Sequence, residues 1–128
     1  MRLLLDTHVF LWWASNAPEL SDSARALISD PASTVFVSAA TAWEVAIKAG
    51  QGRLDVPKNP ERFFADQLER HNFWALEVSF AHTLAVRGLP DHHQDPFDRL
   101  LVAQAQIEGL TLVSADPAIP LYGVPVAW

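Results

Sequence analysis

The sequence predicts an α/β fold in three α/β/α layers, with a central, mostly parallel sheet of about five strands. Short apolar runs alternate along the chain with longer segments of helical periodicity. The segments between successive apolar runs are too long for hairpins, so they predict helical crossovers between parallel strands. A chain of 128 residues with 50% apolar content is sufficient for one core. We therefore expect a single domain over residues 1–128.

The first half of the chain is expected to contain five elements in the order strand, helix, helix, strand, helix. They cover residues 2–5, 8–14, 21–28, 34–37 and 40–49. Ser21 and Ser38 are placed to cap the second and third helices, because a serine hydroxyl can accept from a free helical N–H. Gly50 provides a stop for the third helix, and a linker over residues 51–59 follows.

The second half is expected to continue as helix, strand, helix, helix, strand and a short edge strand. These elements cover residues 60–71, 74–78, 79–86, 96–108, 111–114 and 124–127. Pro60 and Pro96 stand at first helical positions, where proline lacks only an N–H that is free anyway. Asp95 is expected to cap the long helix that Gly109 ends. Pro125 indicates an edge position for the last strand.

Four carboxylates stand where an apolar run meets a turn or a helix start: Asp6, Glu44, Asp98 and Asp116. In a parallel α/β sheet, ligands bind in the crevice outside the carboxyl ends of the strands. Acids delivered there by separate elements would repel one another unless a cation joined them. The pattern therefore predicts a divalent-metal site of hard oxygen ligands, suited to Mg²⁺ or Mn²⁺.

Composition excludes several classes of site and partner. The chain has no cysteine, which rules out disulfides and thiolate metal ligands. A net charge of −6 argues against broad adhesion to nucleic acid, although bound cations can reverse the sign of a local cleft. No apolar run reaches the ~20 residues of a membrane span. We expect no membrane association, no targeting segment and a cytoplasmic location.

Each acid also has a plain structural interpretation. For Asp95 we prefer the role of a helix cap. Asp98 could be a first-turn acid favoured by the helix dipole, but a cap at Asp95 makes a second acid there optional, which favours the metal role. Asp116 before Pro117 could equally open a turn. Glu44 lies in a largely apolar helix, so it needs a cation or a solvated face.

The histidines and basic residues give weaker signals. The adjacent His92 and His93 lie in a polar loop, where we expect solvated side chains rather than a zinc site. His8 is expected to pack on the surface, although it could line the metal site. Arg99, Lys48 and Arg53 lie near the predicted site and could hold a phosphate. Arg99 could instead pair with a neighbouring carboxylate, and we single out none of the three as an RNA contact.

Several aromatic residues could belong either to the core or to an interface. Phe10, Trp12, Trp13 and Trp43 fall at helical spacing, which is more often a core pattern. The nearly continuous apolar character of residues 9–13 nevertheless favours partial use as a dimer or partner surface.

Four parts of the sequence resemble the PIN-domain ribonucleases, and within them the VapC-type toxins of bacterial toxin–antitoxin pairs. They are residues 3–8 (LLLDTH), Ser38 with Trp43-Glu44, residues 95–105 (DPFDRLLVAQA), and residues 112–116 (LVSAD) followed by residues 122–126. The resemblance spans nearly the whole chain, and the third segment is highly specific. Gln94 stands where the family often has a basic residue, and Ser114 stands where it often has threonine and keeps the hydroxyl.

The resemblance implies a PIN-like fold and a Mg²⁺- or Mn²⁺-dependent endoribonuclease. It carries the family's catalytic, metal-binding acids onto Asp6, Glu44, Asp98 and Asp116. A metal-activated water would hydrolyse an RNA phosphodiester bond, leaving a 5′-phosphate and a 3′-hydroxyl. It also implies a homodimer that a cognate antitoxin protein silences by covering the acidic site.

Two other functions remain open at this level. A PIN-like module could bind RNA or a protein without catalysis, with its acids serving only as solvated helix starts. A haloacid-dehalogenase-like phosphatase would phosphorylate the acid after the first strand. That chemistry needs a second aspartate two positions later, where this chain has His8.

Overall fold

The computed structural model describes residues 1–56 and 59–128, and its centre is a five-stranded sheet in the order β3-β2-β1-β4-β5. The strands are β1 (Arg2–Leu5), β2 (Thr34–Ser38), β3 (Trp74–Leu76), β4 (Thr111–Val113) and β5 (Val126–Ala127). All four neighbouring pairs are parallel. The predicted parallel α/β fold is therefore confirmed. The expected linker over residues 51–59 includes residues 57–58, which lie outside the described residues.

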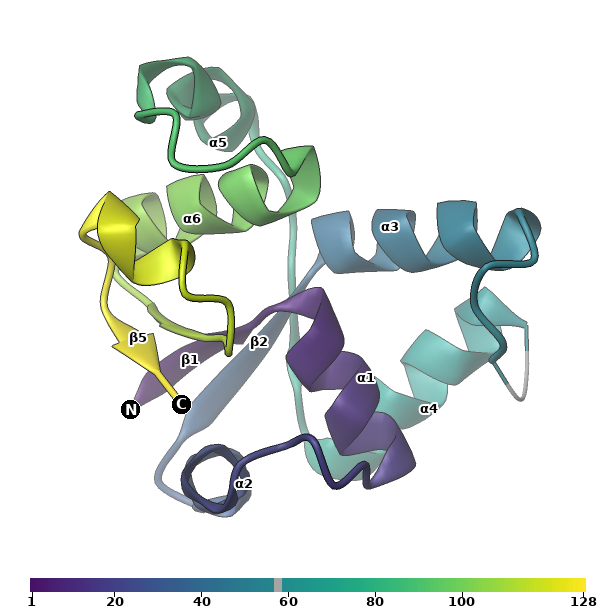
Figure 1. Ribbon diagram of the computed structural model, residues 1–128. Helices are drawn as coiled ribbons and strands as arrows, with labels where there is room; N and C mark the ends of the chain where they lie inside the picture. Colours follow the sequence, from purple (N-terminus) through teal and green to yellow (C-terminus); the bar gives the residue numbers. More distant parts are fainter. Residues whose placement is uncertain (57–58) are drawn as a thin grey trace.

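Helices cover both faces of the sheet, as Figure 1 shows. They are α1 (Thr7–Ser15), α2 (Asp22–Ser29), α3 (Ala39–Gly50), α4 (Pro60–His71), α5 (Phe80–Ala85) and α6 (Pro96–Glu108), with 3₁₀ turns η1 (Val86–Gly88) and η2 (Ile119–Tyr122). Helices α1, α2 and α4 pack on one face, and α6 with η2 packs on the other. Helix α5 lies over α6, and α3 extends from the edge of the sheet (Figure 1).

Alternate residues of the central strand β1 belong to two separate apolar clusters, one on each face of the sheet. Leu3 and Leu5 point into the cluster shared with α1, α2 and α4. Leu4 points into the cluster shared with α6 and η2. All three leucines are fully buried, because a strand covered on both faces has no solvated side. This central position of β1 places the residue that follows it, Asp6, in the middle of one sheet edge.

The helix caps follow the sequence prediction. Ser21, Ser38 and Asp95 each accept a hydrogen bond from the first turn of their helix.

No helix among the described residues combines the length and apolar character needed to cross a bilayer.

Two strand boundaries differ from the prediction for identifiable reasons. The strand expected over residues 74–78 ends at Leu76, because the carbonyl of Glu77 accepts from the side chain of Gln104 rather than from a strand. The last strand begins only at Val126, since Pro125 has no N–H and offers the sheet only its carbonyl. The 3₁₀ turn at residues 119–122 was not expected.

A buried amide joins the elements that carry the acids. Gln104 of α6 is fully buried, and its Oε1 accepts from the Ser38 hydroxyl at 2.6 Å. Its Nε2 donates to the Glu77 carbonyl at 3.2 Å and lies 3.3 Å from Nδ1 of His82. Ser38 also accepts from the Ala40 amide, so Gln104 ties α6 to the start of α3. These bonds fix α3 and α6 relative to the sheet edge.

Replacement of this amide tests the role of the junction. We expect Gln104→Leu to lower the free energy of unfolding by about 2–4 kcal/mol, because it leaves the proton of the buried Ser38 hydroxyl without an acceptor and the Glu77 carbonyl without its donor. Urea denaturation measures the change. The exposed Gln106, two residues along the same helix, is the matched control, and Gln106→Leu is expected to change stability by no more than about 0.5 kcal/mol. Equal effects of the two substitutions would contradict this role.

Candidate metal centre

Three of the four predicted acids line one open cleft at the carboxyl edge of the sheet. Asp6 follows β1 and caps α1, Asp98 lies in the first turn of α6, and Asp116 lies three residues beyond β4. The cleft has a volume of about 280 Å³, and its other lining residues are His8, Trp12 and Ala115. The fold therefore brings together acids that lie as much as 110 residues apart in the chain, 116 − 6.

Strand register explains why two of these acids meet. β1 and β4 are parallel neighbours with Leu5 level with Val113. The amide of Asp6 donates to the carbonyl of Val113 at 3.1 Å, which holds the end of β1 against the end of β4. The chain after β4 then turns at Ser114, whose hydroxyl accepts from the amide of Asp116 at 3.1 Å.

Asp6 is held rigidly and is almost completely buried, with 5% of its surface exposed. Its Oδ1 accepts from the Val9 amide at 2.8 Å as the cap of α1. Burial raises the pKa of Asp6 above its ordinary value, and the hydrogen bonds from the Ser114 hydroxyl and the Val9 amide only partly offset this effect. Asp6 thus serves both as a cap and as a carboxylate of the cleft.

Asp98 is the second strongly perturbed acid. Burial is the largest cause that raises its pKa, which reaches about 7. The negative charges of Asp95, Asp6 and Glu44 raise the pKa further, while His93 lowers it. This acid is distinct from the cap, because Asp95 accepts from the amides of both Phe97 and Asp98, as its preferred interpretation predicted.

Glu44 is buried but is not among the residues that line the cleft. It is 3% exposed, and its Oε2 accepts from Lys48, one helical turn further along α3, at 2.5 Å. Its Oε1 is buried and has no hydrogen-bond partner among the described residues. The predicted need for a cation is thus met on one oxygen by Lys48, while the other oxygen is unsatisfied. Lys48 is committed to this pair and does not stand free as a phosphate contact.

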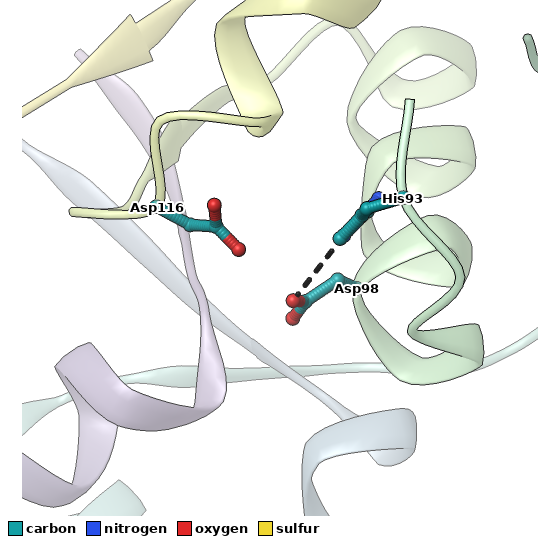
Figure 2. Close-up of side chains that lie close together, drawn as sticks. All are labelled: His93, Asp98 and Asp116. Carbon is teal, nitrogen blue, oxygen red and sulfur yellow. Dashed lines mark ion pairs between the residues drawn. The ribbon is translucent and has the colours of Figure 1, made fainter. Parts of the chain in front are cut away.

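Asp116 and His93 approach Asp98 from two different loops, as Figure 2 shows. His93 Nε2 lies 3.5 Å from Asp98 Oδ2. One ligand atom from each of His93, Asp98 and Asp116 lies within 4.8 Å of the others. Asp116 also opens a turn, since its Oδ1 accepts from the Ala118 amide, so both interpretations of this residue hold structurally. The expectation that His93 is solvated is wrong: its side chain is only 17% exposed.

Arg99 anchors the loop that carries His93. Its guanidinium donates to the carbonyls of Pro90 at 2.8 Å and Leu89 at 3.3 Å, and to the Tyr122 hydroxyl at 3.1 Å. Its nearest carboxylate, that of the exposed Asp91, lies 3.8 Å away. Of the two possibilities raised for Arg99, the structure favours the neighbouring carboxylate over phosphate, because the guanidinium donors are used on the protein's own loop.

The aromatic residues near the site divide between core and surface. Phe10 is fully buried and stacks on Phe64, so the expected interface role is wrong for this residue. Trp12 and Trp13 are partly buried, and Trp12 lines the cleft. Trp43, beside Glu44, is 60% exposed and packs edge-on against Phe97.

The donor set fits a hard divalent cation. It offers carboxylate oxygens from separate elements, and the pKa values of Asp6 and Asp98 are raised by burial and by the charge of neighbouring carboxylates. It also includes a buried Glu44 oxygen and a buried His93 nitrogen that have no hydrogen-bond partner among the described residues. A cation would reverse the sign of the local potential and satisfy such groups. Fold and site together define an α/β protein with an acidic cleft of metal-binding chemistry.

The family model described as PIN domain matches residues 3–124. Two relatives from Mycobacterium tuberculosis are similar in sequence. Ribonuclease VapC22 is 34% identical over 116 residues, 89% of this chain and 86% of that protein. Ribonuclease VapC16 is 33% identical over 67 residues, and that match spans 52% of this chain and about half, 48%, of that protein. The chain belongs to the PIN domain family.

Solved structures agree on the fold. VapBC2 from Rickettsia felis, solved with a DNA fragment from its promoter, matches with a TM-score of 0.73 at 17% identity, covering 99% of this chain and 98% of that chain. FitAcB from Neisseria gonorrhoeae matches with a TM-score of 0.62 at 19% identity, covering 97% and 95%. At such identities these structures support the fold alone, and the PIN-like architecture predicted from the sequence is confirmed.

The raised pKa of Asp98 predicts how stability depends on pH in the cation-free protein. Its carboxyl titrates near pH 7 when folded and near its ordinary ~3.9 when unfolded. Between these values the folded state binds the extra proton, so the free energy of unfolding should fall as pH rises from about 4 to about 7. Asp98→Asn should make this decline smaller, leaving the part that comes from the raised pKa of Asp6, and should stabilise the protein at pH 8 by about 1–3 kcal/mol.

Urea unfolding in chelator at several pH values measures this effect. The exposed Asp91, seven residues earlier, gives the control Asp91→Asn, which should follow the wild-type pH profile. A wild-type stability that stays level or rises between pH 4 and pH 7, with Asp98→Asn following the same profile, would contradict the assignment.

Proposed function

We propose that this protein is a metal-dependent endoribonuclease and the toxin of a toxin–antitoxin pair of the VapC type. The observation that carries the proposal is the convergence of Asp6, Asp98 and Asp116 on one open cleft, beside a buried and unsatisfied oxygen of Glu44. Relatives named as ribonucleases VapC16 and VapC22 support the choice of RNA as substrate.

In this proposal Asp6, Glu44, Asp98 and Asp116 are the catalytic acids that hold Mg²⁺ or Mn²⁺. An ion held by these residues would supply positive charge to the phosphodiester and would lower the pKa of the water that hydrolyses it. The chain's own contribution is rigid placement of the donors. The Val9 amide and the Ser114 hydroxyl orient Asp6, and Lys48 holds one oxygen of Glu44.

The cleft also suits a nucleic-acid strand in shape, although not in charge. It is open to solvent beside the exposed His8 and the partly buried Trp12. Because the protein carries a net charge of −6, its affinity for a polyanion depends on bound cations at the acidic cleft. This dependence couples RNA binding to metal binding. This coupling distinguishes the nuclease from a non-catalytic binding module, in which RNA binding would not require a metal ion at the acids.

An antitoxin protein and a second copy of the chain are the proposed partners, in the cytoplasm where RNA is available. The structural relatives VapBC2 and FitAB are complexes solved with DNA fragments, which supports a protein partner of the antitoxin kind. The large exposed apolar side chains Trp74, Phe80 and Leu84 lie on β3 and α5, where they support a protein interface.

Cleavage of RNA by the purified protein tests the nuclease directly. With total RNA and Mn²⁺ or Mg²⁺, the wild type should give discrete products with 5′-phosphate ends, and a chelator should stop the reaction. We expect Asp6→Asn to lower the rate at least about a hundredfold, because the substitution removes a metal-binding charge from the reacting centre. Asparagine is an equally good helix cap, so folding should persist.

Asp95→Asn is the matched control, since Asp95 is also a helix cap at the same edge, partly buried, but is not proposed as a ligand. Its rate should stay within a few-fold of wild type. Activity that survives in Asp6→Asn or in excess chelator would rule out this mechanism.

The apolar surface on α5 gives a prediction for the dimer. The wild type should have twice the mass of one chain in light scattering. Phe80→Ser with Leu84→Ser should give a monomer with an unchanged circular dichroism spectrum, because both side chains are exposed, by 88% and 73%. A dimer that persists in the double variant would place the interface elsewhere, and a monomeric wild type would contradict the proposed dimer.

A further inference from the structure

His93 occupies an unusual position for a loop histidine. Its ring packs edge-on against Tyr122, and its Nδ1 lies 2.6 Å from the Tyr122 hydroxyl. The opposite nitrogen, Nε2, is buried and has no hydrogen-bond partner in the part of the chain that the structure describes, although it lies 3.5 Å from Asp98 Oδ2. One side of the ring is thus fixed by the protein, while the other faces the acids of the cleft (Figure 2).

The hydrogen bonds around Tyr122 are compatible with a proton on Nδ1 of His93. The Tyr122 hydroxyl accepts from Arg99 at 3.1 Å, and its own proton can reach the His93 carbonyl at 3.4 Å. A hydroxyl has one proton and two lone pairs, so its remaining lone pair is available to an N–H at Nδ1. This arrangement allows the His93 tautomer that has its proton on Nδ1 and a free lone pair on Nε2. Such a partner on the far nitrogen commonly orients metal-binding histidines.

The spacing of the facing atoms is close to that of ligands around one ion. The ligand atoms of His93, Asp98 and Asp116 lie within 4.8 Å of one another. Around an octahedral ion with bonds of ~2.1 Å, ligand atoms are about 3–4.2 Å apart. Side-chain movements of less than about 1 Å would therefore bring the three ligand atoms to these separations. The buried, unpartnered oxygen of Glu44 supplies an independent sign that this region accommodates a cation.

We propose that His93 Nε2 is a nitrogen ligand of the metal centre and that it shifts the preference of the site from Mg²⁺ toward Mn²⁺. Mg²⁺ is a hard ion that takes oxygen ligands and water, whereas imidazole increasingly favours first-row transition ions. The inference rests on the proposed function, since it assigns a fifth donor and a metal preference to the same site.

The competing arrangement is an ordinary contact in which Nε2 carries a proton and donates to Asp98. In that case His93 would hold the carboxylate in place and would not touch the ion. The two arrangements differ in whether nitrogen is directly bonded to the metal, which a spectroscopic measurement separates without any assay of RNA cleavage.

Pulsed electron paramagnetic resonance of the purified protein loaded with Mn²⁺ alone gives this measurement. The wild type should show the nitrogen coupling of a directly bound imidazole. The coupling should disappear in His93→Gln and persist in His92→Gln and His8→Gln, which control for the adjacent loop histidine and for the histidine that lines the cleft. Displacement of Mn²⁺ should need about tenfold less Mg²⁺ in His93→Gln than in the wild type.

Tyr122→Phe gives a second variant that retains the ligand itself. It removes the hydroxyl that fixes the ring, and Mn²⁺ affinity should fall by about tenfold or more, with the nitrogen coupling weakened. If His93→Gln does not fold, the double variant His8→Gln with His92→Gln identifies the coupled ring. Of the five histidines, His71 packs between Trp13 and Phe73, and His82 is engaged with Glu108, so neither reaches the cleft.

The outcomes separate this inference from the proposed function. Two results would overturn the role of His93: Mn²⁺ that binds the wild type without nitrogen coupling, or coupling that persists in His93→Gln. Neither result would contradict metal binding by the carboxylates. Failure of the wild type to bind Mn²⁺ at all would overturn both.

Discussion

Mutual repulsion among carboxylates at one edge of the sheet is the constraint that organises this protein. Asp6, Asp98 and Asp116 enter one cleft from three separate elements, and the charge of Glu44 is close enough to raise the pKa of Asp98. Burial and like charge both disfavour this arrangement in the cation-free protein. Stability elsewhere in the fold must offset this repulsion, and a bound cation would relieve it.

The surrounding structure holds these acids in place through hydrogen bonds that do not depend on a cation. Asp6 is tied to α1 as its cap and to β4 through its amide. Gln104 joins α6 to the start of α3, and Arg99 donates hydrogen bonds to carbonyls of the loop before α6. Because these connections pair polar groups of the protein with one another, the acids cannot move apart without leaving polar atoms unpaired. The site is therefore arranged in advance of any ligand.

Local patterns in the sequence were sufficient for the strands, the caps and three acids of the cleft. A buried run ending in Asp6, or Asp95-Pro96 opening a helix, has a direct structural meaning. Pairing across long separations was not accessible in this way. His92 and His93 are alike in sequence, yet only His93 turns inward, because Tyr122, 29 residues later, fixes its ring. The use of Arg99 on loop carbonyls and of Lys48 on Glu44 likewise depends on tertiary placement.

The central claim is that these carboxylates share a divalent cation, and a crystal structure of the protein grown with Mn²⁺ tests it most directly. An anomalous difference peak should lie within about 2.2 Å of carboxylate oxygens from at least two of Asp6, Asp98 and Asp116. An ordered cleft in which the acids are bridged only by protein side chains, with Mn²⁺ bound elsewhere on the surface, would contradict the claim.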